Sequence, residues 1–237
     1  MIKDIFGQAL QDYTQGDTEA ELILHTSYGD AEEMPVDVFF REPDEFTELE
    51  TIALTLCDGK TLDVGAGAGI HAFYLQEKGF DIDALDISEK ACRIMRTLGI
   101  KNIIHQDFFS LSDVRHYDTL LFLMNGIGIA GTLKNLKHTL DKAENLLKPG
   151  GQLLFDSSDI SYLYEEFGVE KPSYYFGEVR YQYEYKGQKG EKFPWLFVDQ
   201  KALIEVADEK GWLIQFLYED EYNQYLVRMV KRQTYTS

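Results

Sequence analysis

From residue 60 to residue 159 the sequence alternates short apolar runs with longer stretches of helical periodicity, and this alternation leaves few possible folds. Each apolar run has the length of a strand, and each stretch between two runs is long enough for one helix. Repeated βαβ order predicts a parallel sheet with helices on its faces. We therefore expect a three-layer, doubly wound α/β fold with strands at 61–64, 81–86, 102–105, 119–124 and 152–156.

The connecting stretches carry start and stop signals for helices. Ser88 is a suitable N-cap for a helix whose apolar side chains fall on one face. Gly79 and Gly99 suit the left-handed residue that ends a helix. A longer helix begins at Thr132 and should stop at the turn 148–151, which contains a proline and two glycines.

The chain changes character after residue 160. Strands at 174–186 and 192–198 would form an inserted β-hairpin, within an insertion of about 160–198. One face of its first strand carries Val179, Tyr181, Tyr183 and Tyr185. That face suits the wall of a ligand pocket, a dimer contact or a half-buried added strand.

The two ends of the chain complete the expected fold. A helix capped by Asp199 precedes two strands, 212–218 and 222–230, which should pair as an antiparallel hairpin at the sheet edge. Residues 1–59 are expected to be mainly helical and to pack as a lid over the carboxyl edge of the sheet. The rest, 60–237, would be the ligand-binding domain.

Composition excludes some partners. The formal net charge is −18, and such an acidic surface makes nucleic acid an unlikely substrate, because nucleic-acid binding relies on clustered Lys and Arg. The two cysteines, Cys57 and Cys92, lack metal-site spacing and indicate reduced thiols in the core. No apolar run approaches the ~20 residues of a membrane span, and the N-terminus lacks a signal-peptide core. We expect a cytoplasmic protein with no membrane association, either a monomer or a homodimer.

The most specific local signal is the segment LDVGAGAG at residues 62–69. Glycines directly after a strand allow a tight turn and a close approach of the backbone to a ligand. Asp86 ends the second strand, 21 residues after Gly65, where a carboxylate can accept hydrogen bonds from ribose hydroxyls. Asp107 follows the third strand, within reach of an adenine amino group. Together these residues predict an adenosine-containing ligand.

Two such ligands remain open at this point. Residues 67–72 fit the G-x-G-x-x-A form of the dinucleotide fingerprint, although the match begins two residues after the strand has ended. Asp63 lies just before the glycines, where a carboxylate would repel a pyrophosphate. The same carboxylate suits the ammonium and sulfonium of S-adenosylmethionine (SAM).

The ordered motifs LDVGAGAG, DALDIS with Asp86, HQDFF with Asp107 and LLKPGGQLLFD resemble those of class I SAM-dependent methyltransferases over residues 60–156. The resemblance implies a mostly parallel seven-stranded sheet of order 3-2-1-4-5-7-6, with strand 7 antiparallel. It implies SAM as cofactor, S-adenosylhomocysteine as product and no metal. The residues that it places around SAM are Asp63, Gly65, Ala66, Gly67 and Gly69 at the methionine part, Asp86 at the ribose, Asp107, Ile87 and Phe108 at the adenine, and Leu123, Met124 and Asn125 beside the donor methyl.

Methyl transfer from SAM is an in-line displacement that needs aligned reactants, and it needs a base only if the acceptor arrives protonated. The candidates for such a base or orienting group are Asn125, His71, Asp156, Tyr28, His25 and Asp159. Arg41 could pair with the SAM carboxylate through its planar fork.

The acceptor is less determined than the cofactor. Asn125 is followed by Gly126 and Ile127 and not by the Pro-Pro-aromatic run of amino-methylating DNA enzymes, and the Pro-Cys of cytosine-C5 enzymes is absent from the sequence. We expect a small-molecule acceptor. The alternatives are a protein acceptor, a SAM-binding protein without turnover, and an NAD-type oxidoreductase.

Overall fold

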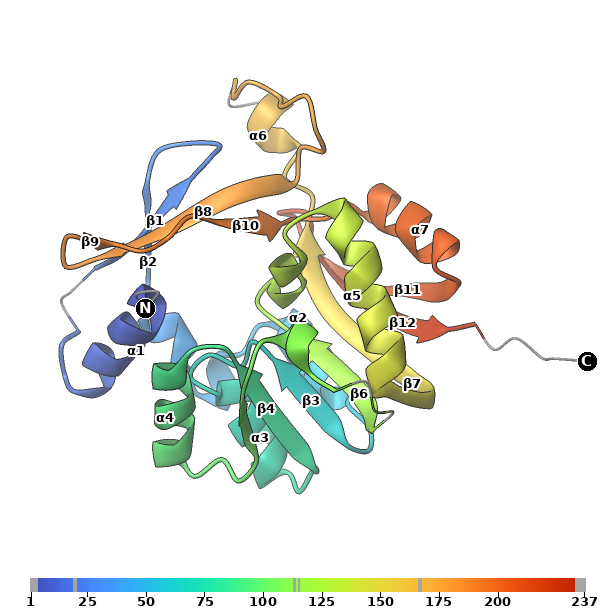
Figure 1. Cartoon of the computed structure of the whole chain (residues 1–237), viewed down its shortest axis with the longest axis horizontal. Coiled ribbons are helices and arrows are strands. Elements are labelled where there is room, and N and C mark those ends of the chain that lie inside the picture. The colour runs from blue at the N-terminus through green and yellow to red at the C-terminus, as the bar shows by residue number, and fades with distance from the viewer. Residues whose placement is uncertain (1–3, 19–20, 113, 115, 166–167, 233–237) are drawn as a thin grey trace, which may run out of the picture.

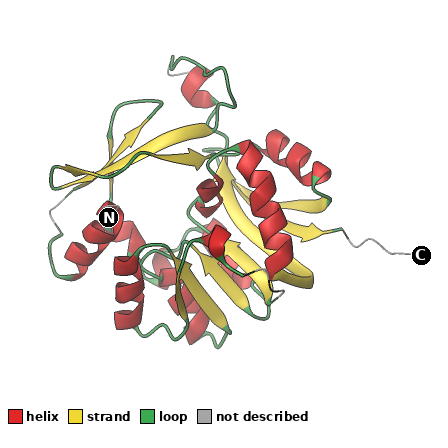
Figure 2. Cartoon of the chain, viewed as in Figure 1, coloured by secondary structure: helices red, strands yellow, loops and turns green. Residues whose placement is uncertain are grey.

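The computed structural model describes residues 4–18, 21–112, 114, 116–165 and 168–232, which form two separate sheets (Figures 1 and 2). The larger sheet has seven strands in the order β11-β12-β7-β6-β3-β4-β5. Its strands are β3 (Thr61–Val64), β4 (Ile82–Asp86), β5 (Ile103–His105), β6 (Tyr117–Phe122), β7 (Leu147–Ser158), β11 (Trp212–Glu219) and β12 (Gln224–Lys231).

This arrangement confirms the order 3-2-1-4-5-7-6. The strands from β5 to β7 are parallel, and β12 pairs antiparallel with both β7 and β11. The terminal hairpin therefore lies at the edge of the sheet, as its short connecting turn predicts. One expectation is wrong at this level: the turn 148–151 already belongs to β7. Leu147 pairs with Tyr117, and the register shifts before Thr119 pairs with Gln152, so the turn residues form an irregular first part of the strand.

Helices cover both faces of this sheet (Figure 2). Neighbouring strand residues enter different cores: Leu120 and Leu153 pack in one apolar cluster, and Leu121 and Leu154 in the other. Both faces of the central strands are buried in apolar clusters, which explains why these strands are apolar throughout. The helices are α2 (Glu48–Thr55), α3 (Ile70–Glu77), α4 (Glu89–Leu98), α5 (Leu133–Leu146) and α7 (Gln200–Glu209).

Helix boundaries follow the local signals. The Ser88 hydroxyl accepts from the Ala91 N–H at the start of α4, and Gly99 ends that helix in the left-handed conformation. Thr132 and Asp199 cap α5 and α7 in the same way. Both cysteines are buried free thiols. Within the described ranges, every helix is too short or too polar to cross a bilayer.

The second sheet combines the N-terminal segment with the insertion. Its order is β10-β8-β1-β2, and β9 pairs with β8. Its strands are β1 (Leu22–Thr26), β2 (Glu32–Met34), β8 (Glu178–Tyr185), β9 (Gln188–Lys189) and β10 (Phe193–Leu196). The inserted hairpin thus forms with shorter strands than expected.

Residues 1–59 contain more helix than strand, but they are not helical throughout. Besides α1 (Ile5–Thr14), α2 and the short helices η1 (Asp37–Phe39) and η2 (Pro43–Glu45), they contribute β1 and β2, and β1 pairs antiparallel with β8. Because its partner lies about 160 residues away along the chain, no local pattern marks β1 as a strand. The bounds of the expected lid (1–59), ligand-binding domain (60–237) and insertion (160–198) stay predictions. Within these ranges, residues 1–3, 19–20, 113, 115, 166–167 and 233–237 lie outside the described part of the chain.

Two glycines allow the second sheet to contact the larger sheet closely. The short helix η4 (Gly126–Ala130) follows β6 and contacts β10. A Cβ at Gly128 would come closer than 3.0 Å to the Trp195 ring, and one at Gly131 would press on Pro194. The absence of side chains at these positions therefore lets β10 approach the end of β6 (Figure 1).

Candidate cofactor and acceptor site

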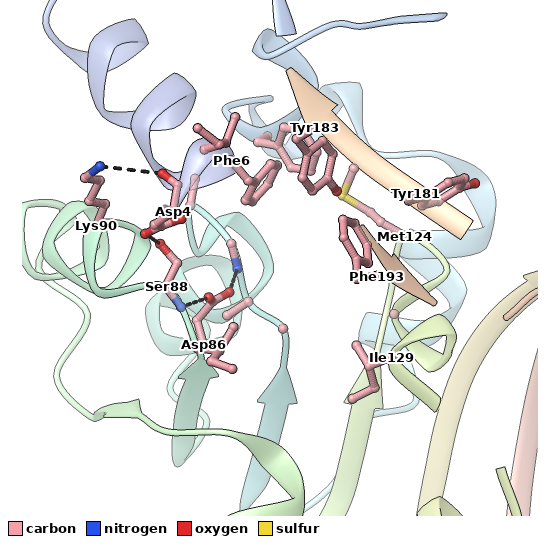
Figure 3. A pocket seen from close by; sticks show the side chains of 18 of the residues that line it. Asp4, Phe6, Asp86, Ser88, Lys90, Met124, Ile129, Tyr181, Tyr183 and Phe193 are labelled. Atoms are coloured by element: carbon pink, nitrogen blue, oxygen red, sulfur yellow. Dashed lines mark hydrogen bonds between the residues drawn. The ribbon is translucent and has the colours of Figure 1, made fainter. Parts of the chain in front are cut away.

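A large cavity lies at the carboxyl ends of the parallel strands, between the two sheets (Figure 3). Its volume is about 1510 Å³. Pockets for one small ligand usually measure about 300–1,000 Å³. One side is formed by the ends of β3, β4 and β6, and the other by α1, β8 and β10. The cavity therefore has room for a cofactor and a second molecule.

The glycine loop forms the floor of this cavity. Gly65 and Gly67 have φ angles of 74° and 57°. A Cβ at Gly65 would meet nothing within 4 Å, and the nearest atom to one at Gly67 is a Phe39 ring carbon at 3.9 Å. Side chains at these positions would point into the cavity, so the loop leaves its backbone open to a ligand. The Gly65 and Ala66 N–H groups donate to the Leu85 carbonyl, which ties the loop to β4.

Gly69 has a different role from the other two. It is not among the residues that line the cavity, and a Cβ there would come closer than 3.0 Å to Ile100 and Met95. Its φ of 91° starts α3 and brings this helix close to α4. The structure thus makes Gly69 a packing residue, although the motif gave all three glycines the same function.

Asp86 connects the loops after β3 and β4. One carboxylate oxygen accepts from the Gly67 N–H at 2.8 Å, and the other from the Ser88 N–H at 2.7 Å. Burial raises the pKa of Asp86, while these two donors oppose the rise. Each oxygen keeps a further lone pair for a ligand. Sequence reasoning missed Asp4, whose carboxylate accepts from the Ser88 hydroxyl at 2.6 Å and so brings α1 to this edge.

The residues expected at the adenine lie next to one another. Asp107 accepts from the Phe109 N–H at 2.7 Å and lines the cavity with Ile87 and Phe108. Ile87 is 68% exposed, and an apolar side chain this open at a cavity is suited to cover a flat ring. Phe108 is buried in the sheet and forms an edge-to-face pair with Phe122.

Asp63 is a buried carboxylate with one oxygen that has no partner in the described structure. It is 2% exposed, and its pKa is raised to about 6 because burial disfavours the charged form; the His71 imidazole and the Ala72 N–H lower it, and Asp86 raises it. An unpartnered carboxylate that lines a cavity favours a ligand cation. The ammonium of SAM fits this requirement.

Arg41 forms an ion pair with Glu50. Its guanidinium donates to both oxygens of Glu50, at 2.9 and 2.7 Å, and it does not line the cavity. The same carboxylate lies 2.8 Å from His71 Nε2. Burial opposes the charge on Glu50, but His71 and Arg41 outweigh it and lower its pKa to about 2. Glu50 thus occupies the planar fork of Arg41 in this structure, and the pairing of Arg41 with the SAM carboxylate stays a prediction.

The turn after β6, which lines the cavity, has a strained backbone. Met124 and Asn125 have φ angles of 56° and 54°, which side-chain-bearing residues rarely adopt. The Asn125 N–H donates to Asp156 at 2.8 Å, and its amide oxygen accepts from the Ser157 hydroxyl at 3.0 Å. With Leu123 these residues line the cavity (Figure 3 labels Met124).

The other candidate bases lie away from the cavity. Asp156 is fully buried behind Asn125, and burial raises its pKa to about 6. Asp159 accepts from the Ser161 N–H, and His25 bonds to Glu184 at 2.7 Å. The Tyr28 hydroxyl lies 3.4 Å from that of Tyr181, and burial raises its pKa to about 12. Of the candidates, only His71 and Asn125 line the cavity.

Comparison with known proteins agrees with this geometry. Residues 41–224 match a family described as a methyltransferase domain. A SAM-dependent methyltransferase from Bacteroides fragilis, crystallised with S-adenosylhomocysteine, is 36% identical with a TM-score of 0.89 over 98% of this chain and 96% of that one. A SAM-dependent methyltransferase from Clostridium acetobutylicum is 17% identical, with a TM-score of 0.58 over 77% of this chain and 87% of that one, and shares the fold.

A curated relative comes from Aphanothece halophytica. This glycine/sarcosine N-methyltransferase is 27% identical over 160 residues, which are 60% of this chain and 57% of the relative. The chain therefore spans little more than half of that relative's length. Taken with the sheet order and the glycine loop, the family match shows that this chain belongs to the SAM-dependent methyltransferases and is an enzyme that uses SAM.

Proposed function

We propose that the enzyme methylates a small molecule that binds in the part of the cavity between the glycine loop and β8. The observation that carries this proposal is the single cavity of about 1510 Å³, which runs from Asp63 to the aromatic side chains of the second sheet. The curated relative supports it, because glycine and sarcosine are small molecules.

The cofactor end of the cavity is assigned by the chemistry of its side chains. Asp63 would pair with the SAM ammonium, Asp86 would accept from the ribose hydroxyls, and Asp107 would accept from the adenine amino group. When bound, SAM supplies an electrophilic methyl group on a sulfonium, which leaves as a neutral thioether. The backbone of Gly65 and Gly67 would lie against the methionine part.

The remaining task of the protein is to position the acceptor. Met124 and Asn125 lie in a strained turn, and Asp156 and Ser157 hold Asn125 in place at the cavity. Well-oriented reactants can gain about 7–11 kcal/mol in model systems, without any contribution from a base. The second sheet lies over this region of the cavity.

Transfer of label from methyl-labelled SAM tests the proposal. The purified enzyme is incubated with the small-molecule ultrafiltrate of a cell extract and, separately, with the desalted proteins of the same extract. We expect label only in the ultrafiltrate. Label only in the proteins would favour a protein acceptor, and tight SAM binding without label in either fraction would make the protein a binder without turnover.

A further inference from the structure

The inner surface of the second sheet is an aromatic wall, made of Tyr181, Tyr183, Phe193 and Trp195. The Tyr183 and Phe193 rings lie 5.2 Å apart, and Tyr181 stacks on Trp195 at 6.1 Å. Figure 3 shows Phe193 and Tyr183 pointing into the cavity on the side of Met124. Ring faces carry a negative quadrupole and attract positive charge.

The charges around the cavity add to this preference. Its described lining contains seven carboxylates, three lysines and no arginine. Lys90 donates to Gln8, and Lys186 pairs with Asp12 and Asp17. The third, Lys192, is exposed on the hairpin between β8 and β10. The lining therefore carries more negative than positive charge, and it contains no arginine that could pair with a carboxylate on the acceptor.

The aromatic wall also lacks a group that could remove a proton from an acceptor. Tyr183 and Tyr181 are its only ionisable members, and burial raises the pKa of both phenols. Both are neutral near pH 7 and can donate a hydrogen bond but cannot act as a base. His71, the candidate base that lines the cavity, has its Nε2 bound to Glu50. An alcohol needs a base to become a nucleophile, whereas a neutral amine already carries a free lone pair.

We propose that the acceptor atom is the nitrogen of a small organic amine without a carboxylate, and that the aromatic wall stabilises the positive charge that this nitrogen gains. The inference rests on the proposed function. The nitrogen lone pair forms the new C–N bond as the C–S bond breaks and its electrons go to sulfur. An amine that arrives protonated first releases its proton to water, because only the neutral form has the lone pair. Positive charge then moves from sulfur to nitrogen, and a product that still carries an N–H releases a proton to water.

Choline and its carbon isostere dimethylbutanol, in which a neutral quaternary carbon replaces the nitrogen, test the charge preference directly. Calorimetric titration of each into the complex with S-adenosylhomocysteine needs no turnover. We expect choline to bind roughly 2- to 30-fold more tightly, the range of a cation over one ring face. Equal binding, tighter binding of dimethylbutanol, or no binding of either overturns the inference.

Two variants at Tyr183 test whether its ring face causes the preference for choline. Tyr183→Leu removes the aromatic ring face and should lower the affinity for choline by the same roughly 2- to 30-fold. Tyr183→Phe keeps the ring face and should retain the affinity for choline. Affinity for S-adenosylhomocysteine in both variants reports that they are folded. Loss of choline affinity in Tyr183→Phe as well would assign the effect to the hydroxyl and contradict the cation mechanism.

Turnover distinguishes this inference from the proposed function. Phenethylamine, phenylethanol and phenylalanine share one skeleton and differ in the acceptor group or in an added carboxylate. Methylation of the amine, with slower transfer to the other two, supports the inference. Faster transfer to the alcohol or the amino acid overturns it and leaves the proposed small-molecule function standing. Label found only in proteins overturns the proposed function itself.

Discussion

Replacement of Asp63 by Asn tests whether the buried, ionised Asp63 carboxylate lowers the stability of the protein when no cofactor is bound. The carboxyl is buried, with a pKa raised from 3.8 to about 6. In the unfolded chain it ionises near pH 4, but in the folded protein only near pH 6. Folding stability should therefore fall as the pH rises from about 4 to 6, and the loss should persist above pH 6.

The size of the change in folding stability follows from the shift in the pKa of Asp63. Two pKa units correspond to about 3 kcal/mol. Asparagine has nearly the same shape and does not titrate, so any fixed cost of burying its amide cancels when one pH is compared with another. The difference in unfolding free energy between Asp63→Asn and the wild type should thus move by about 3 kcal/mol in favour of the variant between pH 4 and pH 7.

Thermal or chemical unfolding at a series of pH values measures this difference. For a chain of this size, 3 kcal/mol corresponds to about 6–12 °C in Tm. SAM should reverse the effect, because its ammonium stabilises the ionised carboxylate: wild-type affinity should weaken about tenfold per pH unit below pH 6, and that of the variant should stay flat. Parallel stability curves for the two proteins, or SAM affinities that change equally with pH, would refute the assignment of Asp63.

Three further changes probe other parts of the site. Asp86→Ala should weaken SAM binding by about 1–3 kcal/mol in calorimetry, since it removes an acceptor for the ribose and for the Gly67 N–H; unchanged affinity in a folded variant would move the ribose elsewhere. Gly128→Ala should lower the free energy of unfolding by about 1–3 kcal/mol, because the added methyl group overpacks against Trp195. The control Gly29→Ala, whose Cβ would meet only the Thr26 hydroxyl at 4.0 Å, should leave it unchanged. Equal Tm values for the two variants would contradict the close contact at Gly128. Glu50→Gln should lower the free energy of unfolding by about 3 kcal/mol at pH 7. This loss should shrink as the pH falls from 4.5 towards 2, because the wild-type carboxyl then also becomes neutral. A loss that does not change with pH would exclude the ionised bridge between Arg41 and His71.

The sequence by itself determined the larger sheet and most of its cofactor edge. Thr61–Val64 is the strand that was predicted, Ser88 caps α4, and Asp86 lies beside the glycine loop. These features depend on hydrogen bonds and apolar spacing between residues near in sequence, or on the fixed order of parallel strands, so local patterns carry them. Asp63, Asp107 and Asn125 line the cavity for the same reason: each lies at or just after the end of a parallel strand.

Only the tertiary structure decided the parts built from distant segments. The pairing of β1 with β8 brings the N-terminal segment and the insertion into one sheet, which turns the Tyr181–Tyr185 face into a cavity wall. Glu50 pairs with Arg41, and Gly69 packs against Met95. Strand pairing and ion pairing across the chain leave no periodic signal, because their energy comes from a partner whose position depends on the whole fold.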